Sequence, residues 1–232
     1  WGMWNGAVPD ADSVVIAIID TGTDWDHPDL INNIWNNPGE DADGDGHTLE
    51  FSGGQWVFDP ADINGSDDDG NGMADDLIGW DFAGPNKPIF NPDNDPDPSP
   101  NQGCYGLLMH GTHVAGCASA ATNNGVGIAA VGFNAKIMPV KVSFDDDFDC
   151  PSPGVYADAA VYLYAAKSGA DIINCSYGGG NYSGVIQSAI NVAHDTYGCV
   201  IVAAAGNSNS SSTHYPSGYQ NVVSVASTNS AD

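Results

Sequence analysis

Val14-Val15-Ile16-Ala17-Ile18-Ile19-Asp20-Thr21-Gly22 is the stretch that decides the fold, because an apolar, mostly β-branched run ends there in a carboxylate. The run is short and bounded by polar residues, which predicts a fully buried strand over residues 13–19. Strands that are apolar on both faces belong to parallel sheets covered by helices on both sides. Catalytic groups in such sheets collect where strands end, so Asp20 is a candidate catalytic acid.

The rest of the chain alternates strand-like runs with helical periodicity. Further strands are predicted at 135–142, 171–174, 199–205 and 222–226, and helices at 110–121, 154–168 and 183–197. This alternation predicts an α/β fold with three layers, α/β/α, around a mostly parallel central sheet. No linker or repeat divides the chain, so we expect one domain over residues 1–232.

The charge is extreme, with 30 acidic residues against 4 Lys, no Arg and a net charge of −26. Nucleic acids and anionic membranes would be repelled, and no run of 18 apolar residues predicts a membrane span. Most of the acids are Asp, which favours caps, turns and cation-binding loops. A solvated acidic surface remains the alternative for many of them, and a saline habitat is not distinguishable here from calcium loading.

Residues 31–104, rich in Asp, Asn, Gly and Pro, are predicted to form a long loop region stabilised by ions. The segment 67–76 places oxygen donors at alternate positions with a Gly at the turn, as in the first part of an EF-hand-like loop. The twelfth position is Ile78 rather than Glu, so we expect a Ca²⁺ loop outside the EF-hand fold. Its predicted ligands are Asp67, Asp69, Asn71 and Asp75; a second set is Asp41, Asp43 and Asp45, with Glu50 as a possible helper, and a third is Asp93, Asp95 and Asp97.

The five cysteines contain no C-x-x-C pair that would indicate zinc or redox chemistry. Cys117, Cys175 and Cys199 lie in apolar patterns and are predicted to be buried free thiols. Cys104 and Cys150 lie in polar segments and are able to form a disulfide in an oxidising compartment.

Two further polar side chains, like Asp20, are predicted to lie at the end of a strand or at the start of a helix. His110 opens the small-residue helix His110-Gly111-Thr112-His113-Val114-Ala115-Gly116, and Asn207 follows the strand that ends Ala203-Ala204-Ala205-Gly206. A Ser–His–Asp device needs an acid that orients the imidazole and donors aimed at the oxyanion. Asp20, His110 and Asn207 are therefore candidates for one site.

The segments around Asp20, His110 and Asn207 resemble motifs of the subtilisin-like serine proteases. A fourth motif of that family is matched by Asn174-Cys175-Ser176-Tyr177-Gly178-Gly179, and the four occur in the same order. The resemblance implies that Asp20 orients His110, that His110 shuttles the proton, and that Asn207 stabilises the oxyanion. It also assigns substrate contacts: extended substrate adds as a strand to Ser176, Tyr177, Gly178 and Gly179, and the pocket before the scissile bond is lined by Ala204, Ala205 and Gly206.

The same resemblance implies a strong calcium site and a disulfide. The calcium ligands would be side-chain oxygens of Asp29 and Asn124 and backbone carbonyls of Val126 and Ile128, and the disulfide would join Cys104 to Cys150. We expect a secreted endopeptidase acting on protein or peptide substrates, in which Trp1 is a processed end.

The nucleophilic Ser of the family has no counterpart, because no Ser stands in a Gly-Thr-Ser-Met-Ala-like turn. We expect a nicked or truncated enzyme whose fold is incomplete at the C-terminus and whose Ser lies on a companion C-terminal fragment. This chain alone is then inactive. The alternatives are an inactive protease-like calcium-binding module, and an aspartic protease in which Asp20-Thr21-Gly22 would need a second such segment.

Overall fold

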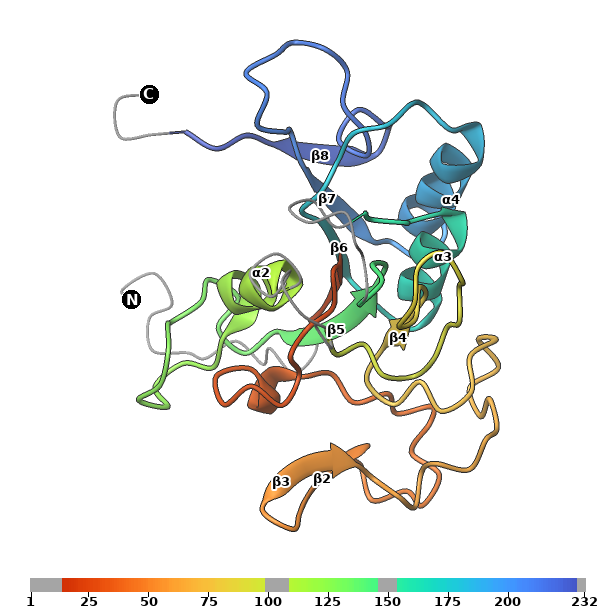
Figure 1. The fold of residues 1–232 in the computed structure, drawn as a ribbon, viewed down its shortest axis with the longest axis vertical. Helices are drawn as coiled ribbons and strands as arrows, with labels where there is room; N and C mark the ends of the chain where they lie inside the picture. The colour runs from red at the N-terminus through yellow and green to blue at the C-terminus, as the bar shows by residue number, and fades with distance from the viewer. Residues whose placement is uncertain (1–13, 99–108, 146–153, 229–232) are drawn as a thin grey trace.

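The computed structural model describes residues 14–98, 109–145 and 154–228, and its central element is a six-stranded sheet (Figure 1). The strand order is β4-β5-β1-β6-β7-β8, and every neighbouring pair is parallel. The strands are β1 (Val15–Asp20), β4 (Trp80–Asp81), β5 (Lys136–Lys141), β6 (Ile172–Cys175), β7 (Val200–Ala204) and β8 (Val222–Val225). The predicted parallel α/β sheet is confirmed, with each predicted strand recovered to within two residues.

Helices cover both faces of this sheet, as Figure 1 shows. α2 (His110–Ser119) lies on one side, and α3 (Ala159–Lys167) and α4 (Gly184–Asp195) lie on the other. Successive side chains of β1 point to opposite faces: Ala17 joins the core under α3 and α4, and Ile18 joins the core under α2. The three predicted layers are therefore present.

Helix α3 begins at Ala159, whereas the sequence predicted a helix from residue 154. The carboxylate of Asp158 accepts the backbone N–H of Ala160 at 2.8 Å and so caps the helix. Before the cap, the backbone N–H of Tyr156 donates to the carbonyl of Val142, which keeps this segment extended. The apparent periodicity before Asp158 was therefore misleading.

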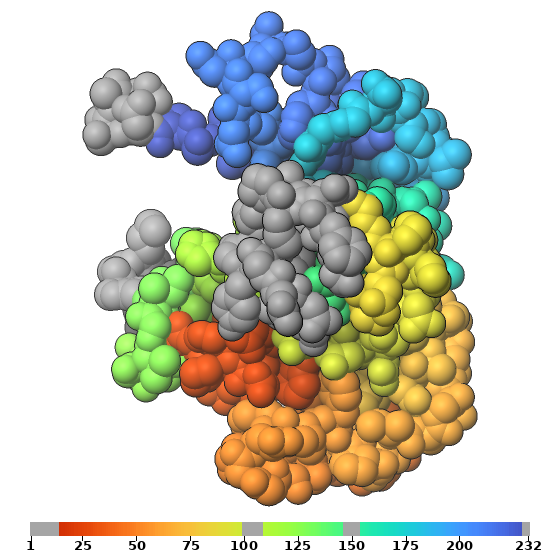
Figure 2. Space-filling view, in the orientation of Figure 1, coloured from red at the N-terminus to blue at the C-terminus, as the bar shows by residue number. Residues whose placement is uncertain are grey.

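The acidic region contains more regular structure than the loop predicted over residues 31–104. It includes a 3-10 turn (Ile31–Asn33), the antiparallel hairpin of β2 (Leu49–Ser52) and β3 (Gln55–Phe58), and β4, which joins the main sheet beside β5. In the space-filling view the orange residues of this region form one end of the molecule and the blue C-terminal residues the other (Figure 2). The hairpin carries a cross-strand contact between the rings of Phe51 and Trp56.

The prediction for the cysteines was partly wrong. Cys175 and Cys199 are buried free thiols, but Cys117 is exposed. Helix α2 buries Gly111, Ala115 and Ser119, which repeat every four residues, so Cys117 lies on the opposite face. Cys104 and Cys150 lie outside the described residues. None of the helices in the described ranges is long and apolar enough to cross a bilayer.

Candidate active site

Asp20 and His110 meet where β1 ends and α2 begins. Nδ1 of His110 donates to Oδ1 of Asp20 over 2.8 Å, and the backbone N–H of Thr21 donates to the same oxygen at 2.8 Å. The Asp20 side chain is 2 % exposed, whereas the His110 side chain is 49 % exposed. The carboxylate is therefore buried behind an imidazole that remains open to a reaction partner.

The segment after β1 fixes the first turn of α2 through two side-chain hydroxyls. The hydroxyl of Thr21 accepts the backbone N–H of Gly111 at 3.0 Å, and the hydroxyl of Thr112 accepts the backbone N–H of Asp24 at 2.9 Å. Gly111 lies directly against the carbonyl of Gly22, where a Cβ would clash. These contacts explain why small and hydroxyl residues flank the two catalytic candidates. They hold the start of α2, and with it His110, in a fixed position relative to Asp20.

The electrostatics of the pair favour a protonated imidazole. The pKa of His110 is raised above its ordinary value, first by the hydrogen bond to Asp20 and further by the charge of Asp20, although burial opposes the shift. The second oxygen of Asp20, Oδ2, is buried and has no hydrogen-bond partner among the described residues. Such a pair is suited to take up a proton during a reaction and return it.

A buried lysine lies beside the pair. Lys141 is opposite Asp20 in the β1–β5 register, is 1 % exposed, and donates to Asp81 at 2.8 Å and to Asp145 at 2.7 Å. Burial lowers the pKa of Lys141, but the two carboxylates outweigh it and raise the pKa overall. The side chain also packs close to Gly22. Lys141 thus ties β4 and the end of β5 to the loop that follows Asp20.

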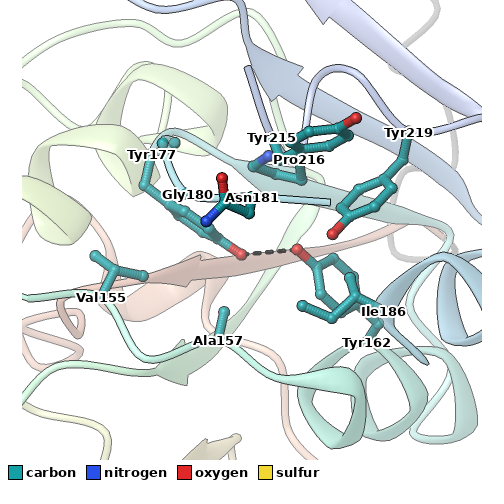
Figure 3. Close-up of a pocket in the computed structure, with 12 residues that line it drawn as sticks. Val155, Ala157, Tyr162, Tyr177, Gly180, Asn181, Ile186, Tyr215, Pro216 and Tyr219 are labelled. Atoms are coloured by element: carbon teal, nitrogen blue, oxygen red, sulfur yellow. Dashed lines mark hydrogen bonds between the residues drawn. The ribbon is translucent and has the colours of Figure 1, made fainter. Parts of the chain in front are cut away.

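Three of the four residues of the substrate segment predicted after β6, Tyr177, Gly178 and Gly179 but not Ser176, line a cavity of about 470 Å³. In Figure 3 the side chain of Tyr177 points toward Tyr162, and their hydroxyls are 3.0 Å apart. The backbone N–H of Gly179 donates to the carbonyl of Tyr215 at 2.8 Å, so one edge of this segment is already paired. The cavity is lined by Val155, Ala157, Tyr162, Tyr177, Gly178, Gly179, Gly180, Asn181, Ile186, Tyr215, Pro216 and Tyr219.

His214 lies between two segments that the resemblance assigned to substrate. A Cβ at Gly178 would collide with the His214 ring, and a Cβ at Gly206 would lie 3.1 Å from its Nε2. The hydroxyl of Ser217 lies 3.3 Å from Nδ1 of His214, within hydrogen-bond distance of the ring. No motif near residue 214 indicates a role for this histidine, because only the fold brings it between Gly178 and Gly206.

The residues after β7 lie on the other side of His214 from Gly178. Ala204 ends β7, and the backbone N–H of Ala205 donates to the carbonyl of Val225 on β8 at 2.8 Å. Gly206 and Asn207 are exposed. Asn207 therefore lies at the same end of the parallel strands as Asp20, although within the described ranges no hydrogen bond joins it to the Asp20–His110 pair.

The four residues predicted for the strong calcium site are brought together in part. Oδ1 of Asp29 accepts from the side-chain amide of Asn124 at 2.7 Å, and Oδ2 accepts the backbone N–H of Ile128 at 2.9 Å. The backbone N–H of Val126 donates to the side-chain oxygen Oδ1 of Asn124 at 3.0 Å. Asp29 is 3 % exposed. The loop thus surrounds a buried carboxylate and donates a hydrogen bond to each of its two oxygens.

Two acidic clusters are compact enough to hold a metal ion within the described part of the chain. One contains Asp41, Asp43 and Asp45, as predicted, without Glu50. The other contains Asp67 and Asp69, as predicted, together with Glu40, which was not among the predicted ligands. The predicted set of Asp93, Asp95 and Asp97 does not form a third cluster among these residues.

The carboxylate of Asp75 does not join the cluster for which it was predicted, although the backbone N–H of Asp75 donates to Oε2 of Glu40 at 3.1 Å. Its carboxylate accepts the backbone N–H groups of Asn64 and Gly65 at 2.9 and 3.0 Å. The backbone of Asp75 is left-handed, with φ of 56°. The neighbouring Asp76 is instead fully buried and contacts Asn71, with Asp76 Oδ2 accepting from its amide at 3.0 Å.

Comparison with known proteins identifies relatives over nearly the whole chain. Residues 11–232 match the model of the subtilase family. A thermophilic serine proteinase of a Bacillus species is 34 % identical over 94 % of this chain and 39 % of its own length. Thermitase of Thermoactinomyces vulgaris is 32 % identical over 94 % of this chain and 56 % of its own length. An extracellular basic protease of Dichelobacter nodosus is 31 % identical over 93 % and 32 % respectively.

Solved structures agree with these relatives. A protease from Pseudoalteromonas arctica superposes with a TM-score of 0.64 and 28 % identity, covering 97 % of this chain and 58 % of that protein. Sphericase superposes with a TM-score of 0.58 and 28 % identity, covering 92 % and 53 %. The chain therefore spans about half the length of these relatives, or less.

Proposed function

The chain belongs to the subtilase family of serine proteases, and on that premise we propose that it carries two of the three catalytic side chains of a peptide-bond-cleaving endopeptidase. The observation that carries the proposal is the 2.8 Å contact between His110 and Asp20. In the proposed reaction His110 takes the proton of a serine hydroxyl and returns it to the leaving amine. Asp20 holds the imidazole tautomer and stabilises the imidazolium.

The nucleophilic serine is assigned to a companion segment outside residues 1–232. The support is twofold: no serine in the described ranges is hydrogen-bonded to His110, and the chain covers only 39 % and 56 % of the length of two of its relatives. Asn207 would donate its side-chain amide to the oxyanion formed at the attacked carbonyl. Loss of such a donor typically costs about 10²–10³ in turnover, a magnitude measured in a member of this same family.

Substrate is proposed to bind as an extended strand along Ser176, Tyr177, Gly178 and Gly179. The cavity of about 470 Å³ beside this segment supports the proposal, because it offers space for a substrate side chain. The residue before the scissile bond would enter between Gly178 and Gly206, where the His214 ring now lies. His214 is thus proposed to control the size and polarity of that residue.

We further propose that the protein works outside the cell and is stabilised by Ca²⁺. The relative from D. nodosus is named an extracellular protease, which supports export. The buried Asp29 and the two acidic clusters support calcium binding, since hard oxygen donors suit this ion. The proposed disulfide between Cys104 and Cys150 would be compatible with that compartment.

Fluorophosphonate labelling of the whole protein tests the proposed activity. The reagent is expected to label one serine and block peptide cleavage, whereas pepstatin-like inhibitors have no effect. His110→Ala should abolish labelling. His113→Ala, three residues further along the same helix and exposed, should leave it unchanged. Absence of labelling in the unmodified protein would favour an inactive calcium-binding module instead, and equal labelling of the two variants would contradict the catalytic role of His110.

A further inference from the structure

We propose that His113 and Cys117, on the exposed face of helix α2, together bind one Zn²⁺ ion. Nδ1 of His113 and the thiolate of Cys117 would be the two protein ligands, and water would fill the remaining positions. Neither residue belongs to the catalytic arrangement proposed above, so metal binding and peptide cleavage can be tested separately.

The first observation is an exposed free thiol. Cysteine is among the residue types most often found fully buried in proteins, and Cys175 and Cys199 follow this rule. Cys117 does not, because it is free and exposed on α2. Packing in the core therefore does not account for Cys117, in contrast to the other two thiols.

The second observation is a histidine one helical turn before this thiol. Nδ1 of His113 lies 4.0 Å from Sγ of Cys117. Side chains four residues apart lie on one face of a helix, and the same spacing brings two histidines to one zinc ion in the H-E-x-x-H motif. The segment His113-Val114-Ala115-Gly116-Cys117 has that spacing, with a sulfur in place of the second imidazole.

The separation of the two donor atoms fits a single shared ion. Zinc binds thiolate sulfur at about 2.3 Å and histidine nitrogen at about 2.0–2.1 Å in a tetrahedral arrangement, which places the two donors about 3.5–3.6 Å apart. The two side chains must therefore approach each other by only about 0.5 Å. Both are exposed, so small side-chain rotations achieve this without movement of the helix.

The surroundings leave room for the water that completes the coordination. His113 also lines a cavity of about 340 Å³ between α2 and the loop at residues 127–128. Within the described ranges, no third His, Cys, Asp or Glu comes close enough to form a three-residue metal cluster with the pair. The site would therefore be open, as in zinc sites that keep a position for water. The net charge of −26 favours the approach of cations.

His27 is the other histidine that lines this cavity, but it is not a ligand. Its Nδ1 accepts the backbone N–H of Asp29 at 3.1 Å. In the neutral ring the proton is then on Nε2, so neither nitrogen offers a free lone pair to a metal. The imidazole that faces Cys117 is therefore the one available.

The donor chemistry selects the kind of ion. Thiolate sulfur and imidazole nitrogen suit zinc and copper, whereas calcium and magnesium take oxygen ligands. The thiol must lose its proton to solvent as the sulfur–metal bond forms, so the affinity should rise with pH. The pair thus differs in chemistry from the acidic loops of the same chain.

Titration of the whole protein with Cd²⁺, a spectroscopic substitute for Zn²⁺, tests the site. A cadmium–thiolate bond gives an ultraviolet charge-transfer band that oxygen ligands do not give, and the titration is done in excess Ca²⁺ with a phosphine reductant. Cys117→Ser should abolish the band, although Cys175 and Cys199 remain. Loss of a residue that only hydrogen-bonds to a metal ligand costs about 10–100-fold in affinity, so His113→Ala should weaken binding by at least about tenfold.

His194→Ala is the matched control, because His194 is also exposed on a helix but its ring contacts Asp195 at 2.7 Å. This variant should bind Cd²⁺ as tightly as the unmodified protein. The proposed pair would be overturned by a band that persists in Cys117→Ser, by equal affinities of His113→Ala and His194→Ala, or by the absence of a band in the unmodified protein. Added Zn²⁺ should displace Cd²⁺ and remove the band, and failure to do so would contradict the assignment to zinc.

Discussion

Replacing Gly111 with Ala should damage the catalytic pair and the fold together. An ideal Cβ at residue 111 would lie 3.0 Å from the Cβ of Asp20 and even closer to the carbonyl oxygen of Gly22. Carbon atoms in contact are about 3.5–4.0 Å apart, so α2 and the end of β1 must separate by about 0.5–1 Å. The hydrogen bond from Gly111 to Thr21 lies in the same gap.

Overpacking of this kind costs about 1–3 kcal/mol, and each kcal/mol lowers the melting temperature of a domain of this size by about 2–4 °C. We therefore expect a loss of about 5 °C in Tm. A misplacement of about 1 Å at reacting groups costs about 10²-fold in rate, so kcat/KM for a peptide substrate should fall by a similar factor. Both quantities are measured on the whole protein, by calorimetry and by peptide hydrolysis.

Gly116→Ala is the matched control. It lies on the same helix, but a Cβ there would meet no heavy atom within 4 Å. Because Gly lowers the stability of a helix interior relative to Ala, this change should raise stability by about 0.5–1 kcal/mol and leave kcat/KM unchanged. If Gly111→Ala and Gly116→Ala gave the same melting temperature and the same kcat/KM, the proposed close packing of α2 on the Asp20 loop would be refuted.

Three other predictions concern the lysine, the cleft and the ions. Lys141→Met should cost about 3–5 kcal/mol in urea unfolding. The pKa of Asp81, already raised by burial, should rise further without the lysine. The loss of unfolding free energy should therefore shrink as the pH falls and the carboxylates bind protons. A loss that does not change with pH would contradict the ion pairing. His214→Ala should open the space between Gly178 and Gly206 and raise kcat/KM for peptides with a bulky residue before the cleaved bond. An unchanged preference would contradict the proposed role of His214 in selecting that residue. Calcium at about 1,000 times its Kd adds about 4 kcal/mol of stability, so chelation should lower Tm; identical melting curves with and without chelator would count against every calcium site.

Local signals in the sequence were sufficient for five of the six strands of the main sheet, all but β4, and for the two catalytic candidates. The run of β1 is apolar at every position, and a strand buried on both faces requires that pattern. Asp20 at its end and His110 at a helix start could be placed in one site, because parallel strands present their carboxyl ends at one edge. The 2.8 Å contact between them agrees with this placement.

Features that depend on long-range contacts were not predictable in the same way. Glu40 gives no signal near its own position, because its carboxylate acts on a loop almost thirty residues further along the chain. Asp75 and Asp76 are chemically identical neighbours, so the sequence does not indicate that it is Asp76 whose carboxylate accepts from Tyr164. His214 becomes relevant only when the fold brings it between Gly178 and Gly206.

Proton NMR titration of the His110 ring is the most direct test of the central claim that Asp20 and His110 act as a pair. In the whole protein this ring is expected to titrate above the ordinary histidine pKa of 6.5, because it is hydrogen-bonded to Asp20. Asp20→Asn should lower the midpoint, since the carboxylate charge is removed while the packing is kept. The same midpoint in both proteins would contradict the pairing.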